Sequence, residues 1–343
     1  MRVLVTGATG FFGRTFVHYL LKEYNGINPI ERVAAFARSE SRLAELSNKY
    51  RNTDPCYRPF LGDIRDEERL IDACQNVDLV VHAAALKRVD DGSYNPSEMI
   101  ATNITGTQNV IKAALAASVS KVIVVSSDKA VAPINVYGAT KFVAEQFAIS
   151  YNAISAPRGT KVSVVRYGNV LGSTGSVLGI WQKQREANQP LTVTDPAMTR
   201  FVMTARDAVQ LVLRVASFME GGEVVVPKLS STRLSDIAEA VAPKSEITYT
   251  GLRVGGEKMD EHLLNSDEQN RACFVGGVSE PQDIVVPPQS PSWVERQRWD
   301  DHSLCIDSAM PFPYSSGNEA YLTHTPHSIY NEIVRSVAES ADY

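Results

Sequence analysis

The chain has 343 residues, of which 44% are hydrophobic, and this is enough to bury a sizeable core in one large or two smaller units. The net charge of −5 and the lack of a long basic run disfavour nucleic-acid binding and attraction to anionic membranes. Since no apolar run approaches the ~20 residues that cross a bilayer, we expect no membrane insertion.

The cysteine pattern indicates a reducing compartment. Cys56, Cys74, Cys273 and Cys305 are widely scattered, without a C-x-x-C pair or a grouping that predicts disulfides or a zinc site. We therefore predict a cytoplasmic protein with no bound metal. The N-terminus starts on the apolar run MRVLVTGATG, with no basic leader or cleavage site, so we expect structure from the first residues.

The first half of the chain alternates between short β-branched runs and stretches with helical periodicity. The apolar runs 2–7, 32–38, 78–85 and 121–127 are typical of buried parallel strands, and the stretches 11–24, 41–50 and 103–117 of intervening helices. A further strand is expected at 161–170. The alternation predicts an α/β fold with a Rossmann-like doubly wound parallel sheet over residues 1–172, a cofactor-binding domain.

The regularity loosens after about Gly172. We expect helices at 205–219 and 234–242, with a strand at 222–227 between them, in a smaller lobe over residues 173–279 that mainly binds substrate. Proline and polar residues dominate from Glu280 to Pro326. Residues 280–343 are therefore predicted to form an extended arm and a terminal helix that pack on the body or on a partner.

A glycine-rich turn between the first strand and the first helix predicts a nucleotide cofactor. Gly7, Gly10 and Gly13 lack side chains, so the backbone can approach a pyrophosphate at the helix N-terminus. The G-x-x-G-x-x-G spacing resembles that of the extended branch of the short-chain dehydrogenase/reductase superfamily. We expect the cofactor to contact the rest of this turn as well, at Thr9, Phe11 and Phe12.

The end of the second strand favours NADP. Arg38 and Ser39 stand where an acidic residue would hold an unphosphorylated ribose, and a guanidinium there can pair with a 2′-phosphate. The alternative is a solvated surface arginine. Asp63, next to Ile64, resembles the adenine-contacting Asp of the superfamily, and its alternative role is a helix N-cap. Both Asp63 and Ile64 are included among the cofactor-binding residues.

Small residues follow the fourth strand in the run HAAALK, and they would let the backbone lie against the cofactor. For the lysine of this run the alternative is a solvated loop position. We add to the cofactor-binding residues Ala83, Ala84, Ala85, Lys87 and Asn103.

Tyr137 and Lys141 lie one helical turn apart and share a face. A cationic lysine and a cofactor ribose beside the phenol would lower the pKa of Tyr137 from about 10 toward working pH. Tyr137 would then accept a hydroxyl proton as hydride leaves for the nicotinamide. The preceding strand ends in Ser126 and Ser127, where the superfamily keeps a hydroxyl, and we assign a catalytic role to Ser127. The alternative for Tyr137 is a merely buried aromatic residue.

Asp128 and Lys129 predict a second kind of chemistry. A sugar oxidised at C4 has an acidic C5 proton, which a base can remove while an acid protonates the departing C6 hydroxyl. Asp128 could be that acid, and Lys129 the base if crowding and desolvation lower its pKa. Hydride then returns to C6, giving a 4-keto-6-deoxy sugar with no net redox change. The alternative is an Asp-Lys surface pair, or an Asp that caps the next turn.

Several blocks resemble the soluble UDP-N-acetylglucosamine 4,6-dehydratases of bacterial surface-sugar biosynthesis. They lie between Arg2 and about Ser266 and include SSDKAVAPINVYGATK, VVRYGNVLGSTGSV, MTRFVMT, GGEVVVPKLSS and GLRVGGEKMDE. The resemblance implies bound NADP that is recycled, a UDP-sugar substrate and a homo-oligomer between dimer and hexamer. It also implies catalytic roles for Asp128, Lys129, Tyr137 and Lys141.

The resemblance further implies a substrate site. Asn169 would hydrogen-bond the nucleotide sugar, and Arg200 and Arg253 would bind its diphosphate through forked guanidinium donors. Glu257 would hold the ribose or orient Arg253, and Lys87 would lie near both nicotinamide and sugar. For Asn169, Arg200, Arg253 and Glu257 the alternative is an ordinary surface ion pair. The chain reads R-V-G-G-E-K where many members read R-P-G-E-K, which changes the reach of Glu257 relative to Arg253.

These residues are compatible with three functions. The leading hypothesis is an NADP-dependent 4,6-dehydratase for a UDP-N-acetylhexosamine, with or without inversion at C5. A nucleotide-sugar 4-epimerase would need Tyr137 and Lys141 but no acid and base for elimination, so Asp128 and Lys129 disfavour it. A non-catalytic NADP(H)-binding regulatory protein could keep the same fold, and the two intact residue pairs disfavour it. The C5 stereochemistry is left open, because it depends on which sugar face receives the proton.

Overall fold

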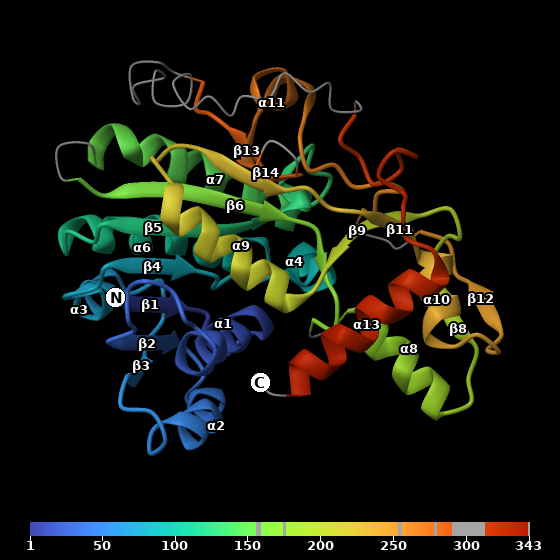
Figure 1. The fold of residues 1–343 in the computed structure, drawn as a ribbon, viewed down its shortest axis with the longest axis horizontal. Helices are drawn as coiled ribbons and strands as arrows, with labels where there is room; N and C mark the ends of the chain where they lie inside the picture. Colours follow the sequence, from blue (N-terminus) through green and yellow to red (C-terminus); the bar gives the residue numbers. More distant parts are fainter. Residues whose placement is uncertain (156–158, 174–175, 253–255, 278–279, 290–312, 342–343) are drawn as a thin grey trace.

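A computed structural model describes residues 1–155, 159–173, 176–252, 256–277, 280–289 and 313–341. Within this part of the chain, the largest sheet has nine strands in the order β13-β14-β10-β6-β5-β4-β1-β2-β3 (Figure 1). Neighbouring strands are parallel from β3 to β10, and β14 pairs in the antiparallel sense both with β10 and with the edge strand β13. The predicted Rossmann-like α/β fold is confirmed.

Most strands of this sheet are short, apolar and rich in β-branched residues, as strands buried on both faces are, whereas the edge strand β3 is partly exposed. The first four in the chain are β1 (Arg2–Thr6), β2 (Arg32–Ala37), β3 (Tyr57–Leu61) and β4 (Leu79–His82). They are followed by β5 (Lys121–Ser127), β6 (Lys161–Tyr167), β10 (Val224–Pro227), β13 (Cys273–Gly277) and β14 (Glu280–Val286). The order runs outward from β1 to β3 and from β4 to β6, so the direction reverses between β1 and β4, where such folds bind ligands.

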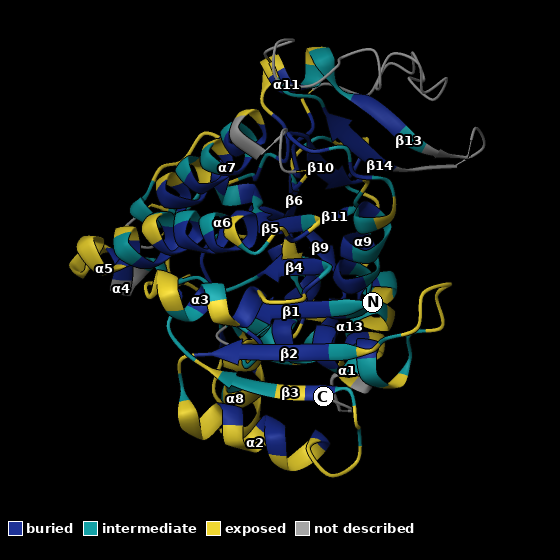
Figure 2. Cartoon of the chain, turned by 90° about the vertical axis from the view of Figure 1, so that its left-hand side faces the viewer, coloured by how far each residue is buried: buried dark blue, intermediate teal, exposed yellow. Residues whose placement is uncertain are grey.

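Helices cover both faces of the sheet. Helices α1 (Phe11–Lys22), α2 (Glu40–Tyr50) and α9 (Ala205–Phe218) share one core with the side chains of Val3 and Val5. Helices α3 (Glu67–Cys74), α6 (Gly106–Ala116) and α7 (Val136–Ser155) share the other core with Leu4. Figure 2 shows the central strands buried between these layers. Alternate residues of one strand therefore belong to two cores, which leaves the strand ends as the exposed edge of the sheet.

A smaller lobe lies beyond the carboxyl ends of the strands (Figure 1). It contains α8 (Val177–Glu186), α10 (Leu234–Val241), the parallel pair β8 (Leu191–Val193) and β12 (Ile247–Tyr249), and the terminal helix α13 (Pro326–Ala341). Trp181 and Ile329 are fully buried in its core. A three-stranded sheet of β7 (Asn169–Val170), β9 (Thr199–Met203) and β11 (Ser231–Arg233) joins the lobe to the main sheet.

The chain returns to the main sheet after it has entered the lobe. Strands β10, β13 and β14 come from sequence positions beyond 172 but belong to the main sheet. The segments 173–279 and 280–343 therefore both add strands to the sheet that the sequence pattern predicts for residues 1–172. The first residues of the expected arm form strand β14, which lies between β13 and β10, and residues 290–312 lie outside the described residues. Residues 313–321, which we call the tail segment, pack against the body with Tyr314 and Tyr321 buried.

Short elements complete the described structure. Helices α4 (Val89–Tyr94), α5 (Pro96–Ile100) and the π-helix η1 (Ala101–Thr105) precede α6, η2 (Asp128–Ala130) is one turn of 3-10 helix, and α11 (Ser266–Arg271) precedes β13. Asn265 caps α11 in a reciprocal capping box with Glu268. None of the helices in the described ranges combines the length and the apolar character that crossing a membrane requires.

Candidate active site

The close packing of the turn between β1 and α1 depends on glycine. Gly7 has a φ of +70°, and a Cβ on it would lie 2.7 Å from the backbone nitrogen of Ala84. A Cβ on Gly13 would collide with the carbonyl oxygen of Gly7. The turn therefore packs closely against both its own helix and the loop that follows β4.

The N-terminus of α1 is available to an anion. Gly10 is its N-cap and offers no side-chain hydrogen bond, so no side chain satisfies the first amides of the helix. Thr9, Phe11 and Phe12 line the same turn, and the Phe12 ring lies 6.2 Å from that of Tyr167. These features fit the pyrophosphate of a dinucleotide.

Hydrogen bonds from Asn103 hold the loop after β4 in place. The Asn103 Oδ1 accepts a bond of 2.8 Å from the Leu86 amide, and its Nδ2 donates to the Leu86 carbonyl and to Thr140 Oγ1 on α7. This buried amide lies in the π-helix η1, an element that is frequent at functional sites. Asn103 thereby sets the course of the loop that carries Ala83, Ala84 and Ala85.

Lys87 follows this loop, and the residue as a whole is exposed although the chain partly surrounds its amine. Burial of its amine by the surrounding chain lowers the pKa of Lys87 below that of an ordinary lysine. An amine in this position is available to a ligand at the mouth of the site.

The adenosine end of the predicted site has a pair of opposite charges. Arg38 is exposed, and its Nη1 lies 3.7 Å from Asp63 Oδ2. Asp63 also accepts from Arg65, and although burial raises the pKa of Asp63, Arg65 and then Arg38 lower it below its usual value. Ser39 caps α2, and the side chain of Ile64 is buried in the core. The alternative role of Asp63 as a helix N-cap is excluded, because Asp66 caps α3.

Tyr137 and Lys141 begin helix α7, directly after the turn that ends β5. The Lys141 Nζ donates to the carbonyl of Val125 at 2.6 Å. Burial lowers the pKa of Lys141 to about 8, against the opposing effect of Glu145. A lysine with such a pKa exchanges protons near neutral pH, as a catalytic site requires.

Asp128 and Lys129 meet at the same place, on the single turn η2. The Lys129 Nζ lies 3.0 Å from each of the two Asp128 carboxylate oxygens and 3.5 Å from Asn169 Oδ1. The Ser127 hydroxyl donates to Asp128 Oδ1 at 2.7 Å. Asp128 is almost fully buried, so the pair is not a solvated surface ion pair. A carboxyl group, an amine and a hydroxyl thus converge at the carboxyl end of β5.

The pKa values of this cluster differ from those expected from the sequence. Burial raises the pKa of Tyr137 above 10, and the cation that opposes this effect is Lys129, together with a hydrogen bond to Ser127, not Lys141. Burial would lower the pKa of Lys129, but the carboxylates of Asp128 and Glu261 outweigh it and raise that pKa. The expected lowering of both pKa values is therefore wrong, because burial dominates at Tyr137, and because Asp128 together with Glu261, which the sequence did not reveal, outweighs burial at Lys129.

The predicted substrate residues are partly brought together. Arg200 is buried, and its Nη2 lies 3.4 Å from Glu257 Oε1, while its charge acts on Lys129. Asn169 reaches Lys129 from the start of β7. Arg253 lies outside the described residues. Gly256, which is part of the extra-residue sequence before Glu257, has a φ of +94° and packs against the carbonyl of Ile134.

A family model described as "Polysaccharide biosynthesis protein" matches residues 3–279, most of the chain. The chain belongs to this family. This membership, together with the relatives below, confirms the resemblance found in the sequence blocks. It leaves the tail segment and α13 outside the matched range.

Two curated relatives of this chain have names that describe different activities. A UDP-N-acetylglucosamine 4,6-dehydratase (inverting) of Campylobacter jejuni is 41% identical over 269 residues, covering 78% of each chain. A UDP-glucose 4-epimerase of Rickettsia massiliae is 38% identical over 274 residues, covering 79% of each chain. The same scaffold therefore occurs under two activities.

Solved structures agree with the fold. The protein Pen from Bacillus thuringiensis superposes with a TM-score of 0.84 at 34% identity, covering 97% of this chain and 98% of that one. A dTDP-glucose 4,6-dehydratase from Streptomyces venezuelae, solved with NAD bound, superposes with a TM-score of 0.67 at 24% identity, covering 75% of this chain and 86% of that one. The second similarity concerns the fold alone.

The sequence motifs did not reveal Glu261 as a residue of the site. Its carboxylate is buried 3.2 Å from the Lys129 amine, and neighbouring Lys258 donates from its Nζ to the carbonyl of Val131 at 2.6 Å. Glu261 is the last residue of the block GLRVGGEKMDE, but no spacing pattern connects it with Lys129, which lies far upstream in the sequence. Only the packing of residues 256–261 against η2 brings the two together.

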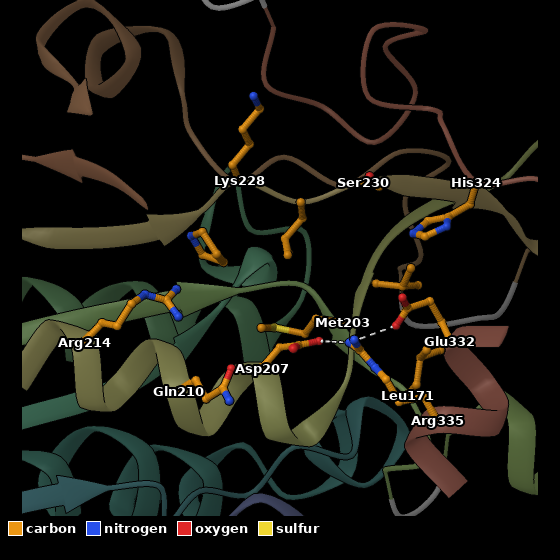
Figure 3. A pocket seen from close by; sticks show the side chains of 13 residues that line it. Leu171, Met203, Asp207, Gln210, Arg214, Lys228, Ser230, His324, Glu332 and Arg335 are labelled. Atoms are coloured by element: carbon orange, nitrogen blue, oxygen red, sulfur yellow. Dashed lines mark hydrogen bonds and ion pairs between the residues drawn. The ribbon is translucent and has the colours of Figure 1, made fainter. Parts of the chain in front are cut away.

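A separate pocket of about 570 Å³ lies between α9, the β10–β11 connection and α13 (Figure 3). Arg335 crosses it, with ion pairs of 2.7 Å to Asp207 and 3.1 Å to Glu332. None of the described residues that we assign to cofactor or substrate lines this pocket. It is therefore distinct from the cluster around Lys129.

Proposed function

We propose that this protein is an NADP-dependent 4,6-dehydratase that converts UDP-N-acetylglucosamine, or a close UDP-N-acetylhexosamine, to a UDP-4-keto-6-deoxy sugar. The observation that carries the proposal is the contact of the Lys129 amine with the buried Asp128 carboxylate, next to Tyr137. An acid and a base beside the redox tyrosine are what the loss of water from C5 and C6 requires. The curated relative at 41% identity bears the name of this activity.

The roles of the pair follow from their charges. Because the pKa of Lys129 is raised, Lys129 carries the proton in the free protein, and Asp128 is its acceptor. We therefore assign protonation of the departing C6 hydroxyl to Lys129 and removal of the C5 proton to Asp128, the reverse of the assignment expected from the sequence. The C–O bond at C6 breaks, and water leaves with the proton of Lys129.

Tyr137 accepts the proton of the C4 hydroxyl when the sugar is oxidised. Burial and Asp128 raise the pKa of Tyr137 in the free protein, and the ammonium of Lys129 and the Ser127 hydroxyl oppose this effect and stabilise the phenolate that this step needs. A nicotinamide dinucleotide bound at the glycine turn supplies the hydride acceptor at C4 and the hydride donor at C6. Asp128 returns a proton to C5, and the proton gained by Tyr137 replaces the one lost by Lys129, so the residues end as they began.

The choice of NADP rests on Arg38. Its exposed guanidinium at the end of β2 can pair with a 2′-phosphate, and Asp63 holds it nearby at 3.7 Å. Arg38→Ala should weaken NADP binding by about tenfold or more, the equivalent of one charged contact, and leave NAD binding within about twofold. Equal losses for both cofactors, measured by titration calorimetry, would remove the preference.

A nucleotide-sugar 4-epimerase is the second candidate, because relatives at 38% identity carry that name. The deciding experiment incubates the purified protein with UDP-N-acetylglucosamine in deuterated water and follows the product by NMR. We expect a 4-keto-6-deoxy sugar with deuterium at C5, whose configuration gives the stereochemistry. An unlabelled 4-epimer contradicts the dehydratase, and an unchanged sugar favours the non-catalytic alternative.

Two variants separate the steps. Tyr137→Phe removes the proton acceptor for C4 oxidation and should abolish all turnover. Lys129→Met should stop elimination. Cofactor reduction by the sugar should be slower, because the ammonium that stabilises the Tyr137 phenolate is lost, but it should remain detectable at 340 nm as a single turnover, since Tyr137 stays in place. Normal product formation by Lys129→Met would remove Lys129 from the mechanism.

Assembly and location complete the proposal. A homo-oligomer between dimer and hexamer is implied by the family resemblance, and a cytoplasmic location by the scattered cysteines. Light scattering coupled to size-exclusion chromatography measures the first. Fractionation of the producing cells measures the second.

A further inference from the structure

Glu261 is a second buried carboxylate in contact with the Lys129 amine, besides Asp128. Its side chain is 4% exposed, and Glu261 Oε1 lies 3.2 Å from the Lys129 Nζ. The amine thus sits between two carboxylates, one from η2 and one from the 256–261 segment. An ammonium ion held by two partners has both a fixed position and a fixed charge.

The remaining groups around Lys129 do not compete for Glu261. Arg200 acts on Lys129 as a like charge, Tyr137 lies next to it, and Asn169 accepts from it at 3.5 Å. The other carboxylate oxygen of Glu261 has no hydrogen-bond partner in the described ranges, and the Lys258 Nζ lies 3.7 Å away. This oxygen therefore has the Lys258 ammonium as its ion-pair partner, while the first carboxylate oxygen of Glu261 contacts Lys129.

The tail segment fixes the backbone of Glu261. The Ser316 amide donates to the Glu261 carbonyl at 2.9 Å, and the Glu261 amide donates to Ser316 Oγ at 2.9 Å. Ser316 Oγ also lies 2.7 Å from Thr199 Oγ1 and donates to the Thr199 carbonyl. Ser316 is fully buried, so these bonds form without competition from water.

We propose that Glu261 is a positioning residue for the reaction, whose carboxylate holds the Lys129 ammonium against Asp128, and that Ser316 of the tail segment holds Glu261 in place. The tail segment, which lies beyond the range of the family match, thereby supports the active site through Glu261. This inference rests on the proposed dehydratase function only for the task that Lys129 performs. The positions and charges stand on the contacts themselves.

The test measures the Lys129 amine directly. The whole protein, without sugar, is labelled briefly with isotopic acetic anhydride at a series of pH values, and the peptide that contains Lys129 is quantified by mass spectrometry. Only the free amine reacts, and the Lys129 side chain is 28% exposed, so the reagent can reach it. Glu261→Gln should move the midpoint of labelling down by about 1–3 pH units, because one of two adjacent charges is lost.

Matched variants separate charge from shape. Glu261→Asp keeps the charge and should leave the midpoint closer to that of the wild type than Glu261→Gln does. Ser316→Ala keeps the carboxylate and the bond to the Glu261 carbonyl but removes the hydroxyl that accepts from the Glu261 amide and anchors the tail segment to Thr199, so its midpoint should fall between those of the wild type and Glu261→Gln. Glu246→Gln, an exposed site in the lobe, makes the same charge change at a distance and should leave the midpoint unchanged.

The outcomes are separable from those of the proposed function. An unshifted midpoint in a folded Glu261→Gln protein overturns the role of Glu261, and an unshifted midpoint in Ser316→Ala overturns the role of the tail segment. If Glu261→Gln fails to fold, Glu261→Asp and Ser316→Ala decide. Where the wild type dehydrates the sugar, Glu261→Gln should also lower kcat by about tenfold or more with little change in KM. Absence of dehydration by the wild type contradicts the proposed function while the labelling midpoints still report on Glu261.

Discussion

Arg166 on β6 forms an ion pair with Glu145 on α7, the helix that carries Tyr137 and Lys141. The Arg166 Nε and Nη2 donate to the two carboxylate oxygens of Glu145 at 3.1 and 2.6 Å, and both side chains are buried. The Arg166 Nη1 and Nη2 also donate to Glu268 on α11 at 2.9 Å. One guanidinium therefore joins the sheet, the catalytic helix and the element that follows Glu261.

Arg166→Leu should destabilise the protein severely. It leaves Glu145 and Glu268 buried without their cation, and breaking such a cluster costs about 3–5 kcal/mol. Urea denaturation measures the free energy of unfolding. Replacing the cluster as a whole, with Arg166→Leu, Glu145→Leu and Glu268→Gln together, should recover much of that loss. Lys22→Met, which breaks an exposed ion pair with Asp54, is the control and should cost no more than about 1 kcal/mol.

Tyr314→Phe tests whether the tail segment is held by the loop after β10. The Tyr314 hydroxyl accepts from the Leu229 amide and donates to the Pro227 carbonyl, both at 2.8 Å, and the ring is fully buried. Losing the hydroxyl leaves two backbone groups without partners, and we expect a loss of about 1–3 kcal/mol in unfolding free energy. Tyr330→Phe on the exposed side of α13 makes the same chemical change and should alter stability by less than about 0.5 kcal/mol. Equal effects of the two variants would contradict the packing of the tail segment.

Gly13→Ala should disrupt the turn between β1 and α1. The new methyl group would meet the Gly7 carbonyl and the Ala8 backbone, which cannot move aside as a flexible side chain can. We expect a loss of about 1–3 kcal/mol in stability and a clear loss of dinucleotide affinity, read by thermal unfolding with and without NADP. Gly179→Ala on α8 is the control, because its methyl group meets nothing within 4 Å. That variant should be neutral or stabilising by up to about 1 kcal/mol.

Glu223 should make the protein more stable in mild acid than at neutral pH. Burial raises the pKa of Glu223 to about 7, against hydrogen bonds from Ser163 and the backbone, while the unfolded chain keeps the ordinary value of 4.5. The folded state therefore binds more protons between these values, and the contribution of Glu223 to stability is lost as the pH rises from about 4.5 to 7. Since one pKa unit corresponds to about 1.4 kcal/mol, the loss is on the order of 3 kcal/mol.

Glu223→Gln isolates this effect. The neutral amide should flatten the stability profile between about pH 4.5 and 7 relative to the wild type and raise the unfolding free energy at pH 8. The comparison is made by urea denaturation at each pH, since other groups titrate equally in both proteins. Glu246→Gln is the control for a surface charge. Parallel profiles for the wild type and Glu223→Gln would contradict the raised pKa.

Local patterns in the sequence were sufficient for the fold and for the cofactor turn. The strands β1, β4, β5 and β6, the helices α1, α2, α6 and α9, and the terminal helix were all predicted, because burial on both faces and helical periodicity leave clear marks on short stretches. The short helices α4 and α5 and the lobe elements α8, β8 and β12 were not predicted. Their stability comes from tertiary packing, such as that around Trp181, and not from local periodicity.

The chain's own order of residues thus determined the parallel sheet, the glycine turn, and the presence of Asp128, Lys129, Tyr137 and Lys141 in one short stretch. Tertiary structure alone decided the charges around Lys129. Glu261, Arg200 and Ser316 reach the site from distant positions, and electrostatic interactions depend on distance in space and on burial, neither of which spacing along the chain reveals. For this reason the pKa of Lys129 is raised where the sequence led us to expect it lowered.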